Sequence, residues 1–277
     1  LSIKNHLFLI DCGEGTQVQL RRCKVNFSRI KHIFISHLHG DHYFGLIGLI
    51  STFMLLGREA ELNIYGPKGM KEVIMLQLKL GKAWFNYPLN FHELVCKESE
   101  VIFEDDKVTV ITVPLKHRVY TNGFVFKEKL GERKINIEAV KDNNIDMSYL
   151  QKIKQGKDIE NNDGKLILNK QITFDPEKPK SYAFCSDTQY YPACIPTIKN
   201  VTALYHESSF LDEHEYLCAK TRHSTARQAA LIAKEATVDR LILGHYSTRY
   251  SSIDKFKTEA KQVFHNVELA EDGKKFI

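Results

Sequence analysis

The chain has 277 residues, of which 43% are hydrophobic and 26% are charged, and its formal net charge at pH 7 is +5. Values so close to the globular average exclude a chain that is disordered throughout, and 15 glycines and 7 prolines without a sustained repeat exclude a collagen-like or coiled-coil rod. The longest apolar stretch, residues 43–57, is too short to cross a bilayer, so no membrane association is expected.

The opening residues favour a cytoplasmic protein whose natural amino terminus lies further upstream. An apolar strand, Leu7–Ile10, runs directly into a Gly-rich turn. Because a domain rarely starts in the middle of its sheet, we expect an amino-terminal strand to be missing. The six cysteines include no CxxC pair and the first residues lack the pattern of a secretory signal, which predicts reduced thiols.

Strand-like and helix-like segments alternate along the chain. Short runs rich in Ile, Val, Phe and Tyr predict strands at Lys31–Ser36, Glu61–Tyr65, Lys107–Val113, Gly123–Phe126, Ser181–Ser186, Val201–His206 and Arg240–Leu243. Helical spacing predicts helices at Phe44–Leu56, Lys68–Leu80, Thr225–Ala236 and Ser252–Phe264. Ser224 or Thr225 is the expected amino-terminal cap of the third helix. This alternation indicates an α/β or α+β fold.

Residues 127–180 break this pattern. They hold twelve basic and ten acidic side chains with few aromatics, and only Met147–Ile153 predicts a short helix. We interpret residues 130–180 as an insertion or protruding arm of a single domain that spans residues 1–277, with a disordered surface loop as the alternative.

The segment with the strongest chemical signal has HxHxDH spacing. It follows the predicted strand Lys31–Ser36 and contributes His37, His39, Asp41 and His42. A turn at Gly40 would fold these side chains toward one point. Four ligand-type groups on one loop suit a metal cluster better than a single ion. Solvated surface histidines are the alternative.

Three further candidate ligands follow later predicted strands. They are His117, Asp187 and His245. Functional groups gather at strand ends in open α/β sheets, and a carboxylate such as Asp187 could bridge two cations. Each of the three would be read as structural if it stood alone, but their order after the HxHxDH segment favours ligation.

This ordered set of residues resembles the metallo-β-lactamase superfamily. Within it, the chain closely resembles the ribonuclease Z family over nearly its whole length, in the segments Phe8–Gln17, Ile33–Gly48, Ile64–Gly69, His206–Phe210, His223–Ala226 and His245–Tyr250. The resemblance implies a four-layer αββα metallo-β-lactamase sandwich with a protruding arm.

The resemblance also implies a metal set. One zinc would be held by His37, His39 and His117. The other would be held by Asp41, His42 and His245, with Asp187 bridging the two. Imidazole and carboxylate ligands suit Zn²⁺, and Mn²⁺ is the alternative. Asp11, which ends its strand, would orient a metal-binding histidine.

The implied reaction is removal of the 3′ trailer from precursor tRNA. A water activated by two metals would attack the phosphodiester after the discriminator base and leave a 3′-hydroxyl. Asp41, His223 and Glu207 would be the catalytic residues. The end of the following helix should lower the pKa of His223, and a Glu207 carboxylate that pairs with the ring could offset this. A simple role for His223 in capping that helix is the alternative.

Several side chains are candidates for holding the substrate. Ser247 and Arg249 could contact the scissile phosphate or only hold their loop. In the arm, Lys152, Lys154 and Lys157 could grip the RNA backbone. The arm lacks the Gly-Pro motif common in the family, since residues 146–149 stand in its place. The resemblance further implies a homodimer.

Two other classes of function compete with this interpretation. A metallo-β-lactamase-fold hydrolase of small esters would share the ligands but would not need the arm. A nucleic-acid-binding module without chemistry would be expected to lose metal ligands, and here all seven are present.

Overall fold

The computed structural model describes residues 1–84 and 86–276. It divides into two compact units, one made of residues 1–127 with 181–277 and the other of residues 128–180. Among the described residues, no helix combines the length and the apolar composition needed to span a membrane.

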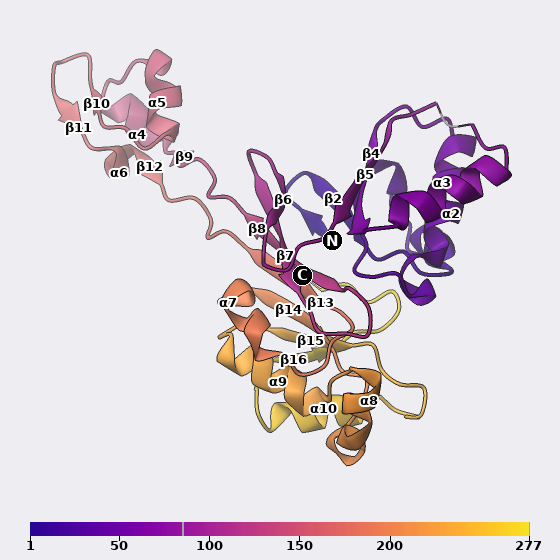
Figure 1. The fold of residues 1–277 in the computed structure, drawn as a ribbon. Helices are drawn as coiled ribbons and strands as arrows, with labels where there is room; N and C mark the ends of the chain where they lie inside the picture. Colours follow the sequence, from indigo (N-terminus) through magenta and orange to yellow (C-terminus); the bar gives the residue numbers. More distant parts are fainter. Residues whose placement is uncertain (85, 277) are drawn as a thin grey trace. The chain divides into compact units, whose positions relative to one another are not determined.

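The larger unit contains two sheets (Figure 1). The first has the order β1-β2-β3-β4-β5. Its strands are β1 (Ser2–Ile3), β2 (His6–Ile10), β3 (Ile30–Phe34), β4 (Leu62–Pro67) and β5 (Leu89–Leu94). From β2 to β5 all neighbours are parallel, so the carboxyl ends of these strands meet at one edge.

The second sheet has the order β16-β15-β14-β13-β8-β7-β6. Its strands are β6 (Val101–Glu104), β7 (Val108–Pro114), β8 (Asn122–Glu128), β13 (Ser181–Cys185), β14 (Ala203–Glu207), β15 (Leu241–Gly244) and β16 (Val267–Leu269). The strands β13 to β16 are parallel, whereas β8 and β13 are antiparallel. The strands predicted from the sequence match the bounds of β7, β8, β13, β14 and β15 to within two residues at each end.

Helices cover the outer faces of both sheets. They are α1 (Thr16–Arg22), α2 (Gly40–Leu55), α3 (Met70–Leu80), α7 (Ile195–Ile198), α8 (Cys218–Thr221), α9 (Ala226–Glu235) and α10 (Asp254–Lys261). Short 3₁₀ turns are η1 (Phe27–Arg29), η3 (Pro192–Cys194) and η4 (Asp212–Leu217). Side chains of α2 and α3 share a core with the first sheet, and those of α9 and α10 share one with the second.

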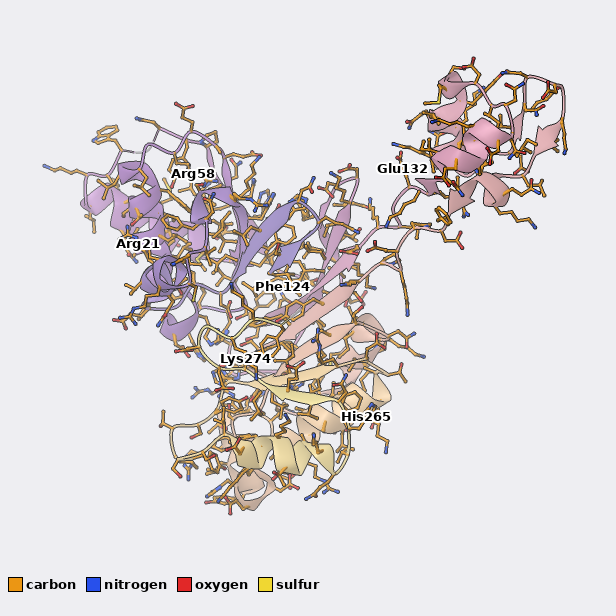
Figure 2. The ribbon with its side chains drawn as sticks, turned by 180° about the vertical axis from the view of Figure 1, so that it is seen from behind. Arg21, Arg58, Phe124, Glu132, His265 and Lys274 are labelled. Carbon is orange, nitrogen blue, oxygen red and sulfur yellow. The ribbon has the colours of Figure 1, made fainter. Side chains whose placement is uncertain are left out.

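A third core lies between the sheets. Phe8 and Phe34 of the first sheet pack against Phe124 and Phe126 of the second, and Figure 2 shows Phe124 among the side chains that fill this space. Helix, sheet, sheet and helix thus form four layers around buried aromatic surface. The predicted four-layer α/β fold is confirmed.

Helix α2 corresponds to the helix expected at Phe44–Leu56, for which the apolar run favours burial. It begins earlier, at Gly40, and buries only the face that carries Leu46, Leu49, Ile50 and Phe53. Phe44 and Leu55 are exposed. The expected burial therefore holds for one face of the helix, and the nearly unbroken apolar run gave no period from which the exposed face could be predicted.

Residues 128–180 form a small unit with a core of its own. Its elements are β9 (Lys134–Ile135), α4 (Ile137–Asp142), η2 (Met147–Tyr149), α5 (Leu150–Lys154), β10 (Ile159–Glu160), β11 (Leu166–Ile167), α6 (Asn169–Ile172) and β12 (Thr173–Phe174). Six buried side chains pack together, namely Val140, Ile145, Ile153, Ile159, Ile167 and Ile172. The segment thus holds more helix than the single turn predicted at Met147–Ile153.

Candidate metal centre

The candidate ligands sit at strand ends of both sheets. His37 follows β3 and His117 follows β7, while Asp187 and His245 follow β13 and β15. His245 has a positive φ of 59°, an uncommon backbone conformation for a residue with a side chain. The two sheets therefore supply ligands from opposite sides to one point.

The loop that carries His39, Asp41 and His42 is held by close backbone packing. The Cys12 N–H donates to the carbonyl of His42 at 2.7 Å, and the Gly45 N–H donates to the carbonyl of Cys12 at 2.9 Å. A Cβ at Gly13 would lie 2.0 Å from the Asp41 carbonyl oxygen, so only glycine permits this approach. The start of α2 is thereby pinned against the Gly-rich turn after β2.

The seven predicted ligands come together in two groups. In each group the potential ligand atoms lie within 4.8 Å of one another. The first group is His37, His39, His117 and Asp187, and the second is Asp41, His42 and His245.

Asp187 faces both groups. Its Oδ2 lies 3.5 Å from His37 Nε2 and 3.8 Å from His117 Nε2. Its Oδ1 lies 3.5 Å from His42 Nε2 and 3.2 Å from His245 Nε2. A carboxylate whose two oxygens face two separate sets of imidazoles has the geometry of a bridge between two cations.

The outward ring nitrogens of the histidines are already bound. In four histidines this nitrogen is Nδ1. His37 Nδ1 lies 3.0 Å from Ser36 Oγ, and His42 Nδ1 lies 2.7 Å from Asp11 Oδ2. His117 Nδ1 lies 2.9 Å from the Arg222 carbonyl, and His245 Nδ1 lies 2.9 Å from Ser209 Oγ. Such partners orient an imidazole and fix which nitrogen is left to bind a metal.

The inward nitrogens provide a test of whether a cation fits. His42 Nε2 and His117 Nε2 are buried without a hydrogen-bond partner among the described residues. A buried polar atom left unpaired is costly, and one metal ion in each group would satisfy one of these nitrogens. The donor set of imidazole and carboxylate is also one that divalent transition metals accept. The residues present therefore fit a metal centre.

The electrostatics of the cluster favour the metal-binding forms of His37 and Asp187, whereas they favour the protonated form of His42. Burial lowers the pKa of His37 to about 2, which leaves a neutral imidazole. Burial works against ionisation of Asp187, but His245, His42 and His37 around it hold its pKa below the usual range. Burial also opposes a charge on His42, yet its hydrogen bond with Asp11 raises its pKa to about 9. Metal binding at His42 would therefore displace a proton.

His223 lies beside the cluster and is held by Glu207. The Glu207 carboxylate is completely buried, and one of its oxygens lies 2.9 Å from His223 Nδ1. It also accepts hydrogen bonds from backbone N–H groups of Thr188, Ser209 and Ser224. Burial disfavours the charged imidazole, but Glu207 outweighs it and raises the pKa of His223. The structure thus pairs these two residues as the sequence predicted.

The ring of His223 faces the space in front of the metal ligands. One of its nitrogens lies within 4.8 Å of ligand atoms of Asp187 and His245, and its ring stacks on that of His245 at 5.3 Å. It precedes α9, whose cap is Thr225 in a reciprocal pair with Gln228. Because Thr225 caps the helix, His223 is available for another role.

The predicted substrate contacts fall in two places. Ser247 is near the cluster, since its N–H donates to the Ser209 carbonyl at 3.1 Å. The Arg249 guanidinium lies 5.9 Å from the centre of the Phe210 ring, which lies 6.4 Å from the ring of His223. The lysines of the arm, Lys152, Lys154 and Lys157, are exposed residues of the 128–180 unit.

Some partners in the site were not predicted. Ser36, Ser209 and the Arg222 carbonyl orient ligands, and Thr188 and Ser224 donate to Glu207. These contacts join residues as far as 105 positions apart, and no local pattern in the sequence marks them. Asp11, by contrast, was expected to orient a histidine and lies against His42.

Comparison with known proteins places the chain in a family. Residues 1–161, more than half of the chain, match the family model described as "Anti-Pycsar protein Apyc1", so this part of the chain belongs to that family. The chain is 43% identical to a protein named Ribonuclease Z from Bacteroides fragilis, over 99% of this chain and 90% of that protein. It is 45% identical to the Ribonuclease Z of Cytophaga hutchinsonii, over 100% of this chain and 88% of that protein.

Solved structures agree with this assignment. The crystal structure of human tRNase Z, short form, superposes with a TM-score of 0.70 at 25% identity, over 99% of this chain and 89% of that one. The metallo-beta-lactamase fold protein YhfI from Bacillus subtilis superposes with a TM-score of 0.65 at 19% identity, over 98% of this chain and 86% of that one, and shows the shared fold. The chain belongs to the ribonuclease Z family of metallo-β-lactamase-fold enzymes.

Proposed function

We propose that this chain is a metal-dependent endonuclease that removes the 3′ trailer of precursor tRNA, cuts after the discriminator base and leaves a 3′-hydroxyl. The observation that carries the proposal is the Asp187 carboxylate, whose two oxygens face two separate groups of imidazoles. Membership of the ribonuclease Z family supports the choice of RNA as substrate.

The proposed cofactors are two Zn²⁺ ions, with Mn²⁺ as the alternative. His37, His39 and His117 would hold one ion, Asp41, His42 and His245 the other, and Asp187 both. When bound, two such cations lower the pKa of water and neutralise charge on the phosphate. Metal analysis of the purified protein should give two ions per chain, and a value near zero would favour a nucleic-acid-binding module without chemistry.

His223 is the proposed proton donor to the leaving 3′ oxygen. Glu207 engages Nδ1 of the ring, so Nε2 is left to face the substrate on the side of Asp187 and His245. Cleavage by His223→Ala should fall by about a hundredfold or more while its metal content stays at the wild-type level. Near-normal turnover would remove His223 from the mechanism.

Close contacts to the RNA are proposed for Ser247 and Arg249 near the cut. Lys152, Lys154 and Lys157 would contact the tRNA backbone, with recognition by shape rather than by base. Replacing these three lysines with alanine should weaken cleavage of precursor tRNA without affecting hydrolysis of a small phosphodiester. Alanine at Lys165, Lys170 and Lys178, which are exposed in the same unit, removes the same charge and serves as the control.

A larger change tests the arm as a whole. Deleting residues 132–179 should weaken cleavage of precursor tRNA far more than hydrolysis of the small diester, because the metal ligands all lie outside this segment. Equal losses for both substrates would count against a role of the arm in holding tRNA.

A homodimer in the cytoplasm completes the proposal. Leu55 and Leu56 at the end of α2, and Leu76 and Leu80 on α3, are exposed apolar side chains that a second copy of the chain could cover. All six cysteines are free, as expected of a reducing compartment. Sedimentation should give a dimer for the wild type and a monomer for Leu55→Asp combined with Leu80→Asp.

The position of the cut tests the function most simply. A precursor tRNA with a 3′ trailer should yield a product that ends at the discriminator nucleotide with a free 3′-hydroxyl. Hydrolysis of small phosphodiesters without cleavage of this RNA would instead favour a small-ester hydrolase of the same fold.

A further inference from the structure

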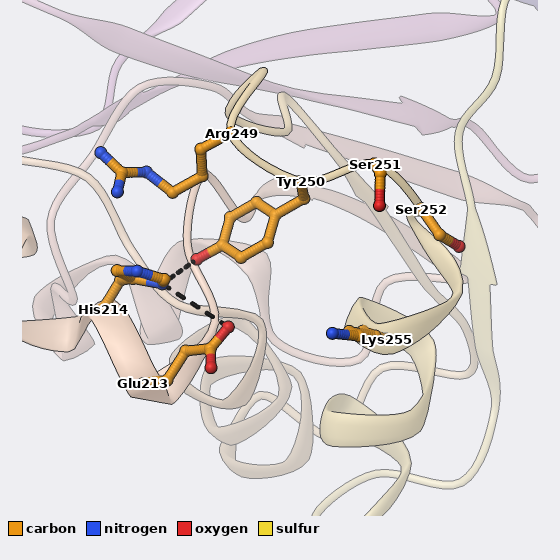
Figure 3. Close-up of a pocket in the computed structure, with 7 residues that line it drawn as sticks. All are labelled: Glu213, His214, Arg249, Tyr250, Ser251, Ser252 and Lys255. Atoms are coloured by element: carbon orange, nitrogen blue, oxygen red, sulfur yellow. Dashed lines mark hydrogen bonds and ion pairs between the residues drawn. The ribbon is translucent and has the colours of Figure 1, made fainter.

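A polar cavity of about 240 Å³ opens next to the loop that follows His245 (Figure 3). Its walls come from three elements, namely residues 249–252 of that loop, Lys255 of α10, and Glu213 with His214 of η4. Small-molecule sites usually enclose about 300–1,000 Å³, so this cavity suits a fragment of a larger ligand rather than a whole one.

Hydrogen bonds hold the walls in place. The Tyr250 hydroxyl accepts a hydrogen bond from the Leu211 N–H at 3.0 Å and lies 2.8 Å from His214 Nδ1. Figure 3 shows the ring of Tyr250 pointing across the cavity toward His214. The loop after the metal ligand His245 and the segment that begins η4 are thus joined through Tyr250, and the cavity between them is built into the fold.

More positive than negative side chains line the cavity. In the described part of the chain, the ammonium of Lys255 has no ion pair, and the guanidinium of Arg249 lies over the Phe210 ring. Asp212 lies 3.7 Å from Arg227, and Asp254 accepts from the neutral hydroxyl of Ser252 at 3.0 Å. With Glu259, these two carboxylates line a second cavity, which Glu213 and Lys255 also line.

Glu213 is the one carboxylate in the wall. It lies 3.6 Å from His214 Nδ1, on the η4 side of the cavity. Two cations and one carboxylate line the cavity itself, and this excess of positive charge favours an anion there.

The position of the cavity identifies which anion. Phe210 links the cavity to the site, since its ring centre lies 5.9 Å from the Arg249 guanidinium and 6.4 Å from the ring of His223. If His223 gives its proton to the leaving 3′ oxygen, the nucleotide that bears this oxygen lies on the His223 side. The strand on the 5′ side of the cut then continues past Phe210 toward the cavity.

We propose that this cavity binds a backbone phosphate of the RNA strand on the 5′ side of the cut, with Lys255 as its main cationic contact. The inference rests on the proposed function, because it takes the direction of the strand from the role of His223. Of the residues proposed above to bind the substrate, only Arg249 contributes to this subsite.

Lysine replacement tests the subsite. Lys255→Ala should lower kcat/KM for precursor tRNA about fivefold to tenfold and reduce the slope of its salt dependence by about 1, with no effect on hydrolysis of bis(p-nitrophenyl) phosphate. Lys261→Ala, an exposed lysine further along α10 that does not line the cavity, is the matched control and should behave as wild type. Glu213→Gln should raise kcat/KM, because it removes the carboxylate from the wall.

Substrate variants locate the phosphate. Precursor tRNAs that carry a single neutral methylphosphonate, placed in turn on either side of the cut, should show a penalty at one 5′-side position with the wild type. That penalty should disappear with Lys255→Ala. A penalty of equal size in both proteins, or one confined to the 3′ side, would overturn the subsite while leaving the proposed function intact.

Failure of the proposed function has a different signature. Wild-type protein would then hydrolyse bis(p-nitrophenyl) phosphate but leave unmodified precursor tRNA uncut, and the subsite proposal would fall with it.

Discussion

Replacing Asp11 with asparagine should weaken metal binding at His42 although Asp11 itself touches no metal. Asp11 Oδ1 accepts from the Ser36 N–H at 2.7 Å, while Oδ2 accepts from Ser36 Oγ at 2.9 Å and lies 2.7 Å from His42 Nδ1. In Asp11→Asn the remaining carbonyl oxygen can keep the bond to the Ser36 N–H. The new amide NH₂ then faces His42 Nδ1.

This change alters the tautomer of His42. Two donors cannot share a hydrogen bond, so Nδ1 must become an acceptor and the ring proton must move to Nε2. Nε2 is the buried nitrogen that faces Asp187 and Asp41, and once protonated it has no lone pair for a metal. Loss of such an orienting partner typically costs 10–100-fold in metal affinity. That range corresponds to about 1.4–2.8 kcal/mol.

Competition with a chromophoric chelator measures the effect. Asp105→Asn is the matched control, because Asp105 Oδ2 lies 2.7 Å from His6 Nε2 and its Oδ1 accepts from the backbone N–H groups of Lys107 and Val108. The same exchange there should leave metal affinity unchanged, since neither residue belongs to the cluster. Wild-type affinity in Asp11→Asn, or an equal loss in both variants, would refute the reasoning.

Three further outcomes follow from the structure. Burial lowers the pKa of His32 to about 4, against 6.5 for an exposed histidine. As the pH falls, the unfolded chain therefore takes up a proton at His32 before the folded chain does. The free energy of unfolding should be unaffected by His32 above pH 6.5 and should fall by about 3 kcal/mol as the pH drops from there through 4. Between pH 6.5 and 4, the stability of metal-free protein in urea should fall more steeply with pH in wild type than in His32→Phe, where other buried histidines such as His37 still contribute a slope. Equal slopes would contradict it. Gly45→Ala should cost about 1–3 kcal/mol, because its Cβ would lie 2.0 Å from a backbone oxygen of Gly13. In Gly48→Ala, on the same helix, the new Cβ would lie 3.2 Å from the flexible end of Gln17, so this variant should be neutral or stabilising. Equal melting temperatures for the two variants would contradict the close packing of Gly45 against Gly13. Removal of bound metal with a chelator should lower the melting temperature, because the ions bind only the folded cluster, and calorimetry that shows no shift would argue against a metal in the native site.

Regular patterns in the sequence located most of the sheets and the larger helices. Alternation of β-branched and aromatic residues marked β7 and β8, and periodic apolar residues marked α3 and α9 to within two residues at each end. Parallel pairing brings the ends of β13 and β15 to one edge of the second sheet, and β3 ends at the corresponding edge of the first, among its own parallel neighbours. Strand ends therefore explain the grouping within each sheet, whereas the meeting of ligands from both sheets was expected only from the family resemblance.

Other features depend on contacts that local patterns do not reveal. The 128–180 unit builds its core from single isoleucines and one valine on very short elements, such as Ile153 on α5 and Ile159 on β10. No element there is long enough to display a period. The partner of His117 is a backbone carbonyl, which every residue carries and which therefore leaves no mark in a sequence.

The central claim is that one carboxylate, Asp187, joins two metal sites. Anomalous diffraction from crystals of the metal-loaded protein, measured at the zinc absorption edge, tests it directly. The account predicts two peaks about 3.5–4 Å apart, one next to each oxygen of Asp187. A single peak, or peaks away from Asp187, would contradict it.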